Sequence, residues 1–403
     1  MKKITSLILV VGLLCTLLLV GCGGGGASSS DSGSSSDDSS GDTIKIGMLI
    51  PYAGVEAQWA KQMEYSTQIA VDEVNENGGL LGKKLEVFYE DTEGMPDVAT
   101  EKANKLLQKN KVDVLMGCIS DASKYAVFDI AEKEHVIYIN PTYYTGALFG
   151  DYFFSSGAGP NKFIYPSIDW AMEQGKKKFY FVGSDYAWGY GCVASAKRYV
   201  EEKGGKVVGD EFTPMDTTDY SATLARIEKS GAEVMMPFVA GTDGATLVKQ
   251  FAAYSLKEKV QICTIHFDET LIKGLDADTV AGITYANDYL QQLDTEENKA
   301  FTKKINEYAG EDLGQSTFGM NSYYNVIFWT KAVEAAGTVD ADEVSKKLVN
   351  LKIDGINGSP VYFDDTHHMV SDVFLTQIND KKEHKLIKTF EQVKPVIEPE
   401  VEM

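Results

Sequence analysis

The chain has 403 residues, and its 59 Asp and Glu residues outnumber its 38 Lys and Arg residues, which gives a formal net charge of -21. This acidity argues against nucleic acid as a partner, because phosphates would repel the chain, and against electrostatic adsorption to an anionic membrane. The length exceeds what one hydrophobic core usually serves, so we expect two domains or lobes.

The first residues are typical of a secretory signal. Two lysines precede an apolar run from Leu7 to Val20, which is too short to span a bilayer. The segment Leu19–Cys22 looks like a bacterial lipobox. We predict that residues 1–21 are a lipoprotein signal peptide and that Cys22 carries the lipid. The alternative is an ordinary cleaved signal with an incidental cysteine.

The following segment predicts a tether. Residues 22–42 are almost wholly Gly, Ser and Asp after the cysteine, a composition that forms a flexible chain with a mean reach of about 25 Å. We therefore expect an extracytoplasmic protein anchored to the membrane through its lipid. The long tether, and a positive charge carried by lysine with only Arg198 and Arg226, resemble a Gram-positive lipoprotein.

From residue 43 onward, strands and helices are predicted to alternate. Apolar runs of strand length start at Ile44, Leu85, Val112, Val136, Lys178, Lys206, Glu233 and Val260. Segments with helical periodicity follow near residues 63–77, 96–110, 122–134, 190–203, 220–230 and 244–254. This alternation is typical of an α/β fold with a doubly wound parallel sheet, and here it occurs twice.

The last third of the sequence differs in pattern. Longer helices are predicted near residues 296–309 and 320–336, a shorter one near 341–348, and strands joined by turns over 359–397. Away from the N-terminal signal, the cysteines stand far apart in the sequence at Cys118, Cys192 and Cys263. Their spacing predicts neither a disulfide framework nor a zinc site.

Six loops follow predicted strands, where an open parallel sheet binds ligands. They are residues 51–59, 117–123, 140–146, 183–189, 238–243 and 266–269, and they mix aromatic side chains, hydroxyls and acids. Such a mixture suits a pocket for a small polar molecule. The alternative is that loops at strand ends are polar in any case and that the aromatic residues only seal the sheet edges.

The sequence gives little support to an enzyme. Ser184 and Asp185 have no histidine close by in sequence for a catalytic triad. The pair His367 and His368 is expected on a solvated turn rather than at a metal. We therefore predict no metal, no cofactor and no catalytic residue.

Residues 43–397 resemble the periplasmic-binding-protein family of the leucine/isoleucine/valine-binding type, with a likeness to its short-chain amide and urea branch. The stretches that carry the resemblance are residues 78–85 with 90–92, then 140–142, 183–189 and 364–368. The resemblance implies two doubly wound parallel-sheet lobes joined by three crossovers near Pro160, Ala286 and Val370. The implied boundaries are 43–160 and 287–370 for lobe 1, and 161–286 and 371–403 for lobe 2.

The resemblance also implies a function. Members of this family capture a small solute, here an amino acid or an amide-like compound, in the cleft between the lobes and deliver it to the permease subunits of an ABC importer. We expect this chain to act in that way as a monomer. The alternative is a sensor that presents the solute to a signalling receptor.

The resemblance extends to individual positions. Trp59 and Phe318 match aromatic residues that meet the ligand, and Trp188 with Tyr186 matches the aromatic pair that shuts over it. Thr142 and Tyr144 match positions that hold the polar head of the ligand. Asp268 or Glu269 matches the acid that receives an ammonium group.

One position departs from the family. Asp121, with Ser120 and Ala122 beside it, matches a place where amino-acid receptors use a serine to hold a carboxylate. An ionised Asp121 would repel a ligand carboxylate, so an amide N–H, an amine or a cation suits this site better. The alternative is that Asp121 caps the helix that it begins.

Overall fold

The computed structural model describes residues 43–265 and 267–399. The predicted signal peptide, the lipid site Cys22 and the linker lie outside these residues. No helix within the described ranges is both long and apolar enough to cross a membrane.

The first sheet is parallel and has the strand order β2-β1-β3-β4-β5. Its strands are β1 (Ile44–Ile50), β2 (Leu85–Asp91), β3 (Val114–Gly117), β4 (Tyr138–Asn140) and β5 (Phe153–Ser155). Helices cover both of its faces, which is why β1 is apolar along most of its length.

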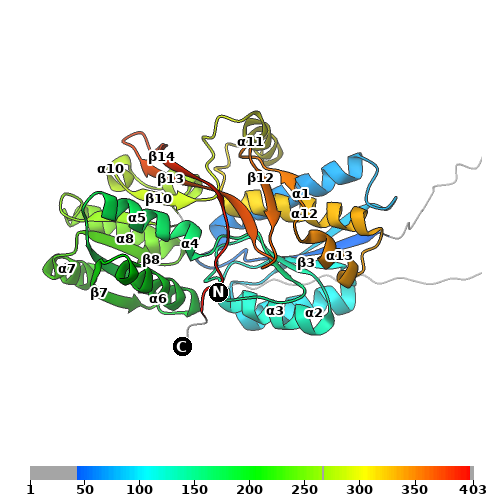
Figure 1. The fold of residues 1–403 in the computed structure, drawn as a ribbon, viewed down its shortest axis with the longest axis horizontal. Helices are drawn as coiled ribbons and strands as arrows, with labels where there is room; N and C mark the ends of the chain where they lie inside the picture. The colour runs from blue at the N-terminus through cyan, green and yellow to red at the C-terminus, as the bar shows by residue number, and fades with distance from the viewer. Residues whose placement is uncertain (1–42, 266, 400–403) are drawn as a thin grey trace, which may run out of the picture. The chain divides into compact units, whose positions relative to one another are not determined.

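Alternate side chains of β1 enter different cores. Met48 lies in the core beneath α1 (Ala60–Glu76) and α12 (Thr317–Ala336). Leu49 lies in the core beneath α2 (Pro96–Lys105), its continuation η2 (Leu106–Asn110) and α3 (Asp121–Glu134). Figure 1 shows these two pairs of helices on opposite sides of β3. On the outer side of this layer, α11 (Glu296–Ala309) packs on α1 and α13 (Ala341–Leu348) packs on α12.

The second sheet is mixed. Five strands are parallel in the order β7-β6-β8-β9-β10: β6 (Lys178–Ser184), β7 (Lys206–Thr213), β8 (Val234–Phe238), β9 (Gln261–Thr264) and β10 (Thr284–Asn287). Beyond β10 the pairing is antiparallel, through β13 (Met369–Ile378), β12 (Pro360–Phe363), β11 (Ile353–Asp354) and β14 (His384–Val393). The short turn between β13 and β14 makes a hairpin, which requires antiparallel strands.

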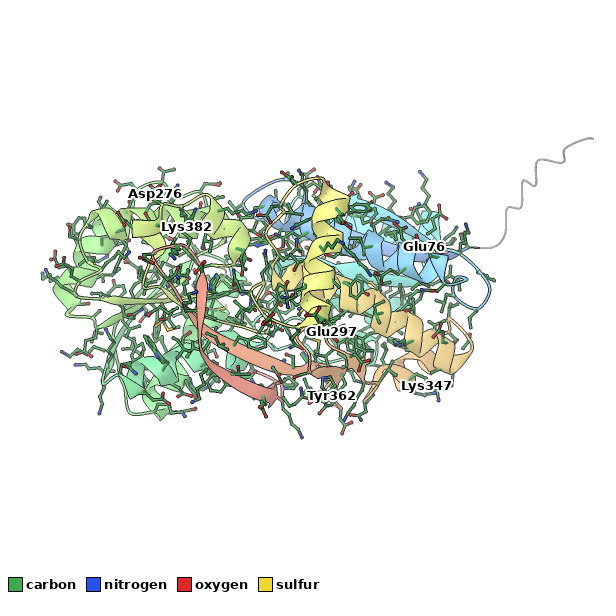
Figure 2. All side chains as sticks on the ribbon, turned by 90° about the horizontal axis from the view of Figure 1, so that it is seen from above. Glu76, Asp276, Glu297, Lys347, Tyr362 and Lys382 are labelled. Carbon is green, nitrogen blue, oxygen red and sulfur yellow. The ribbon has the colours of Figure 1, made fainter. Side chains whose placement is uncertain are left out.

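Helices again cover the parallel part of this sheet. One face packs on α5 (Tyr165–Glu173) and α6 (Ala187–Glu202), and the other on α7 (Ser221–Ser230) and α8 (Gly241–Ala253). The short helices are η1 (Ala57–Trp59), α4 (Pro160–Phe163), α9 (Glu269–Lys273) and α10 (Ala277–Val280). At the β13–β14 turn, Lys382 donates to the carbonyls of Lys273 and Leu275, each at 3.2 Å, and Figure 2 shows it beside Asp276.

The chain passes between the two sheets after β5, after β10 and along β13. The first and third connections are bonded to each other, because Lys162 Nζ donates to the Met369 carbonyl at 2.6 Å and to Ser371 Oγ at 2.7 Å. The predicted fold class, two doubly wound α/β lobes joined by three crossovers, is confirmed, with an antiparallel extension on the second sheet.

Candidate functional site

The loop after β1 lies against the loops at the carboxyl ends of the second sheet. Trp59 Nε1 donates to Asp268 Oδ2 at 2.9 Å, and the Gln62 side chain donates to Thr270 Oγ1. The backbones also approach closely, since a Cβ at Gly241 would lie 2.1 Å from the Val55 carbonyl oxygen. The two sheets are therefore held together at the edge where ligands bind in such folds.

An aromatic cavity of about 20 Å³ lies at this junction. It is lined by Glu56, Trp59, Ile119, Tyr143, Tyr186, Trp188, Ala240, Gly241 and Phe318. The aromatic rings contact one another: the Trp59 and Phe318 ring centroids are 5.3 Å apart, and those of Tyr186 and Trp188 are 6.0 Å apart. Four predicted site residues thus meet here, in a space that holds about one water molecule.

A larger cavity of about 350 Å³ adjoins the first, since Glu56 and Tyr186 line both. Its other lining residues are Ala53, Gly54, Val55, Glu93, Gly94, Met95, Pro96, Ser120, Ala122, Met215 and Asp216. The predicted residues Ser120, Ala122 and Tyr186 therefore lie here. The charged residues among those that line the two cavities are all acidic.

Glu56 is the acid that the two cavities share. Its side chain is buried, with 7% exposure, and Oε2 has no hydrogen-bond partner among the described residues. Burial raises the pKa of Glu56 to about 7, although Lys124 opposes this rise. Glu56 belongs to the predicted loop 51–59, but it could not be singled out from sequence because its burial comes from segments distant in the chain.

Asp121 lines neither cavity. Its Oδ1 lies 3.1 Å from Lys124 Nζ, and its Oδ2 accepts the Thr145 N–H at 3.0 Å, with both charged side chains fully buried. The N-cap of α3 is Ser120, whose Oγ accepts the Ser123 N–H. The interpretation of Asp121 as a helix cap is therefore wrong, because its carboxylate turns toward the buried lysine instead.

Thr142 and Tyr144 are also away from both cavities. The Thr142 hydroxyl donates to the Cys118 carbonyl at 3.0 Å, and the Tyr144 hydroxyl forms a hydrogen bond with His368 Nε2. Tyr143, the neighbour of both, lines the aromatic cavity, and its hydroxyl donates to Asn287. Sequence reasoning missed Tyr143, because two adjacent tyrosines in a loop give no signal of which one faces a cavity.

The prediction of a solvated histidine turn is wrong for His368. Its side chain is 3% exposed and its ring stacks on Tyr144, with centroids 5.6 Å apart. Burial lowers the pKa of His368 to about 4. The bridge between Ser155 and His368 draws this turn against β5, which the sequence does not indicate.

Asp268 and Glu269 stand side by side behind Trp59. Asp268 is the N-cap of α9, where Oδ1 accepts the Thr270 and Leu271 N–H groups, and burial raises its pKa to about 6. Glu269 is buried, with Oε1 unpartnered among the described residues, and burial followed by the charge of Asp268 raises its pKa to about 8. Neither lines the two cavities, but Asp268 binds Trp59, which does.

Comparison with known proteins finds a matching family model and several related binding proteins. A family model described as periplasmic binding protein matches residues 43–383. Leu/Ile/Val-binding protein homolog 6 of Brucella suis is 24% identical over 365 residues, covering 87% of this chain and 92% of the relative. Leu/Ile/Val-binding protein BraC3 of Rhizobium johnstonii is 24% identical over 313 residues, covering 76% of this chain and 83% of the relative.

Solved structures with a similar fold include a solute binding protein of an ABC transporter from Rhodopseudomonas palustris BisB5, in complex with 3,4-dihydroxy benzoic acid. It has a TM-score of 0.78 and 23% identity, and covers 87% of this chain and 98% of its own. An amino acid ABC transporter substrate-binding protein from Pseudomonas fluorescens Pf-5 has a TM-score of 0.78 and 18% identity, and covers 88% and 97%. The family model spans the chain from β1 to the β13–β14 turn, and the chain therefore belongs to the periplasmic binding protein family.

Proposed function

We propose that this chain captures a small polar solute between its two lobes and delivers it to an ABC importer. One observation carries the proposal: aromatic residues from both sides, Trp59 and Phe318 with Tyr186 and Trp188, converge on one cavity at the carboxyl ends of the two sheets. Aromatic faces that exclude water, with a few polar groups among them, are what a solute site needs. The relatives named above are solute-binding proteins.

Capture requires the lobes to part. A cavity of about 20 Å³ cannot admit an amino acid or an amide, so the aromatic walls must separate before a solute enters. We assign residues 43–160 and 287–370 to lobe 1, and residues 161–286 and 371–403 to lobe 2. The Trp59–Asp268 bond would then break and re-form with each cycle of opening and closure.

The proposed solutes are amino acids and amide-like compounds, including urea and short-chain amides. The test is a thermal-shift screen of the full mature chain against amino acids, short amides, urea, polyamines and aromatic acids. A solute at 100 times its Kd adds about 2.7 kcal/mol to stability, which moves the melting temperature measurably. If no compound in these classes shifts it, the proposal is wrong.

Trp188→Leu tests whether the aromatic cavity is the solute site. The variant should lose most of the solute-dependent shift, because Trp188 forms one wall of the cavity. Trp170→Leu is the matched control, since Trp170 is a half-buried tryptophan of α5 that lines neither cavity. Circular dichroism of both variants without solute checks that they are folded.

We further propose that Cys22 is lipidated and anchors the chain outside the cytoplasm. The segment Leu19–Cys22 and the linker that follows support this. The long linker and the scarcity of arginine favour a Gram-positive source, although the relatives named above come from Gram-negative bacteria. Cys22→Ser should move the protein from the detergent phase to the aqueous phase in a partition experiment, and an unchanged distribution would contradict the anchor.

Delivery to a permease is distinguished from sensing by deletion of the gene. Loss of uptake of the solute identified in the screen supports transport. Unchanged uptake with a lost transcriptional or chemotactic response supports the alternative, a sensor that presents the solute to a signalling receptor.

A further inference from the structure

Glu56 brings a carboxyl group to the N-terminal end of α3. The backbone N–H of Ser120, the N-cap residue of that helix, forms a hydrogen bond with the carboxyl group. The start of a helix attracts anions because its N–H groups are unpaired within the helix and its dipole is positive there. The Glu56 carboxyl group therefore already occupies the position at the start of α3 that would attract an anion.

The charged residues near Glu56 offer no cation to pair with a solute carboxylate. Glu93 and Asp216 also line the larger cavity, and neither cavity is lined by a lysine or arginine from the described part of the chain. Lys124 is the cation that acts on Glu56, but its ammonium group is bound by Asp121 and the Tyr143 carbonyl. A solute carboxylate in these cavities would face acids without a compensating cation.

The second oxygen of Glu56 remains available. Oε2 is buried and has no hydrogen-bond partner among the described residues. Gly94 leaves space beside it, since a Cβ added at Gly94 would lie 3.4 Å from Oε2, and Gly94 lines the larger cavity. Buried polar atoms in folded proteins are nearly always hydrogen-bonded, so this oxygen calls for a donor from outside the chain.

We propose that Glu56 selects solutes by their hydrogen-bond donors: its carboxyl group fills the anion-attracting end of α3 and offers Oε2 to an N–H of the solute, so that amides and amines bind and carboxylates of the same shape do not. This inference rests on the proposed function and names the solute class. The aromatic walls formed by Trp59, Tyr186 and Trp188 accept either a neutral amide or an ammonium group.

The test compares three probes with a three-carbon chain: propionamide and propionate, which have nearly equal shape, and propylammonium, which carries only donors at its head. Their Kd values for the full mature chain are measured by calorimetric titration at a pH of about 8.5, above the Glu56 pKa of about 7, so that its carboxyl group is ionised. We expect propionamide or propylammonium to bind at least about tenfold more tightly than propionate, because an unmatched buried acceptor and an unpaired anion each cost about that much or more. If propionamide has the lower Kd of the two donor probes, the site is an amide site; if propylammonium has the lower Kd, it is an amine site.

Glu56→Gln is the decisive variant and Glu101→Gln the matched control. Glu101 is an exposed glutamate of α2 that lines neither cavity, so its neutralisation should leave the preference unchanged. Glu56→Gln removes the charge at nearly constant volume and should reduce the preference for the donor probe by about tenfold. Melting of each variant without solute is recorded to check folding.

The outcomes separate this inference from the proposed function. A wild-type chain that binds propionate as tightly as the donor probes, or a preference that survives Glu56→Gln, overturns the role of Glu56 alone. If the three probes do not bind while the wider screen finds another solute, the selection described for Glu56 is also wrong. If nothing in the screen binds, both the inference and the proposed function fail.

Discussion

The buried pair formed by Asp121 and Lys124 permits a quantitative prediction. We replace Asp121 with Asn, which keeps the size of the side chain and an acceptor for the Thr145 N–H but removes the charge. Lys124 is then left fully buried without its ion-pair partner, although its electrostatic interaction with Glu56 remains. Removing one partner of such a pair typically costs about 3–5 kcal/mol, and we expect Asp121→Asn to lower the free energy of unfolding by that amount.

The double variant separates this charge effect from packing. Asp121→Asn with Lys124→Met removes both charges and leaves the Tyr143 carbonyl without its donor, which costs about 1–3 kcal/mol. The double variant should therefore be more stable than Asp121→Asn alone. We expect a double-mutant coupling energy of about 3 kcal/mol between Asp121 and Lys124, which is the upper end of the range for residues in contact.

The assay is urea unfolding at pH 7, followed by tryptophan fluorescence and circular dichroism. Coincident transitions and an unchanged slope show that the change lies in stability and not in the mechanism of unfolding. The matched control is Glu343→Gln with Lys346→Met, a pair at the same spacing with a distance of 2.8 Å and side chains 53% and 67% exposed. No coupling should be detectable there.

A cost of less than about 1 kcal/mol for Asp121→Asn would contradict this prediction, since removing one partner of a buried ion pair is strongly destabilising. Unchanged stability together with an altered preference among solutes would contradict it as well. That result would support Asp121 as a solute contact, which the resemblance offered beside the alternative of a helix cap.

Two further predictions concern closure and pH. Gly241→Ala should weaken solute binding and favour a more open form in small-angle scattering, because its Cβ would meet the Val55 carbonyl at 2.1 Å only when the lobes are together. Gly204→Ala is the control, because Gly204 also has a positive φ, +76 against +45 at Gly241, but its added Cβ would meet nothing within 4 Å. Equal losses of affinity in both variants would contradict a steric effect on closure. The pKa of Glu269 is raised from 4.5 to about 8 in the folded chain, so the folded chain keeps this proton at pH values where the unfolded chain has lost it. The contribution of Glu269 to stability is therefore full below pH 4.5 and is lost as the pH rises toward 8. In Glu269→Gln, the unfolding free energy should therefore fall less between pH 5 and pH 8, and the difference from wild type is at most about 5 kcal/mol at roughly 1.4 kcal/mol per pKa unit. Asp268 makes the unfolding free energy of both proteins fall slightly over the same range. If both proteins show the same dependence on pH, Glu269 is ionised when folded.

Most of the fold could be predicted from sequence because buried parallel strands are continuous apolar runs. The strand β1 is an example, and the helices after it follow from their 3.6-residue period. The strands β5 and β10 were missed because they are short, and the segment Thr284–Asn287 has no distinctive apolar pattern. The helices α1 and α6 start a few residues before their predicted positions because their first turns continue directly from strand-end loops.

The site was harder to predict because burial is a property of the tertiary structure. In sequence, Asp121 and Lys124 look like an exposed pair one helical turn apart, and only the packing around α3 makes both inaccessible. Trp59, Tyr186 and Trp188 stand in predicted strand-end loops, whereas Phe318 lies on α12. All four were assigned through the family resemblance, and they line the same cavity. Glu56 gives no comparable signal, since a glutamate in a loop is usually exposed.

The bond from Lys162 to the start of β13 has a mechanical consequence. With two of the three connections fastened to each other, the halves of the molecule lose much of their freedom to slide or twist independently. If the lobes part as proposed, we expect them to rotate about that fastened pair, with the segment after β10 as the third connection. The parts of the lobes farthest from the fastened pair would then move the most.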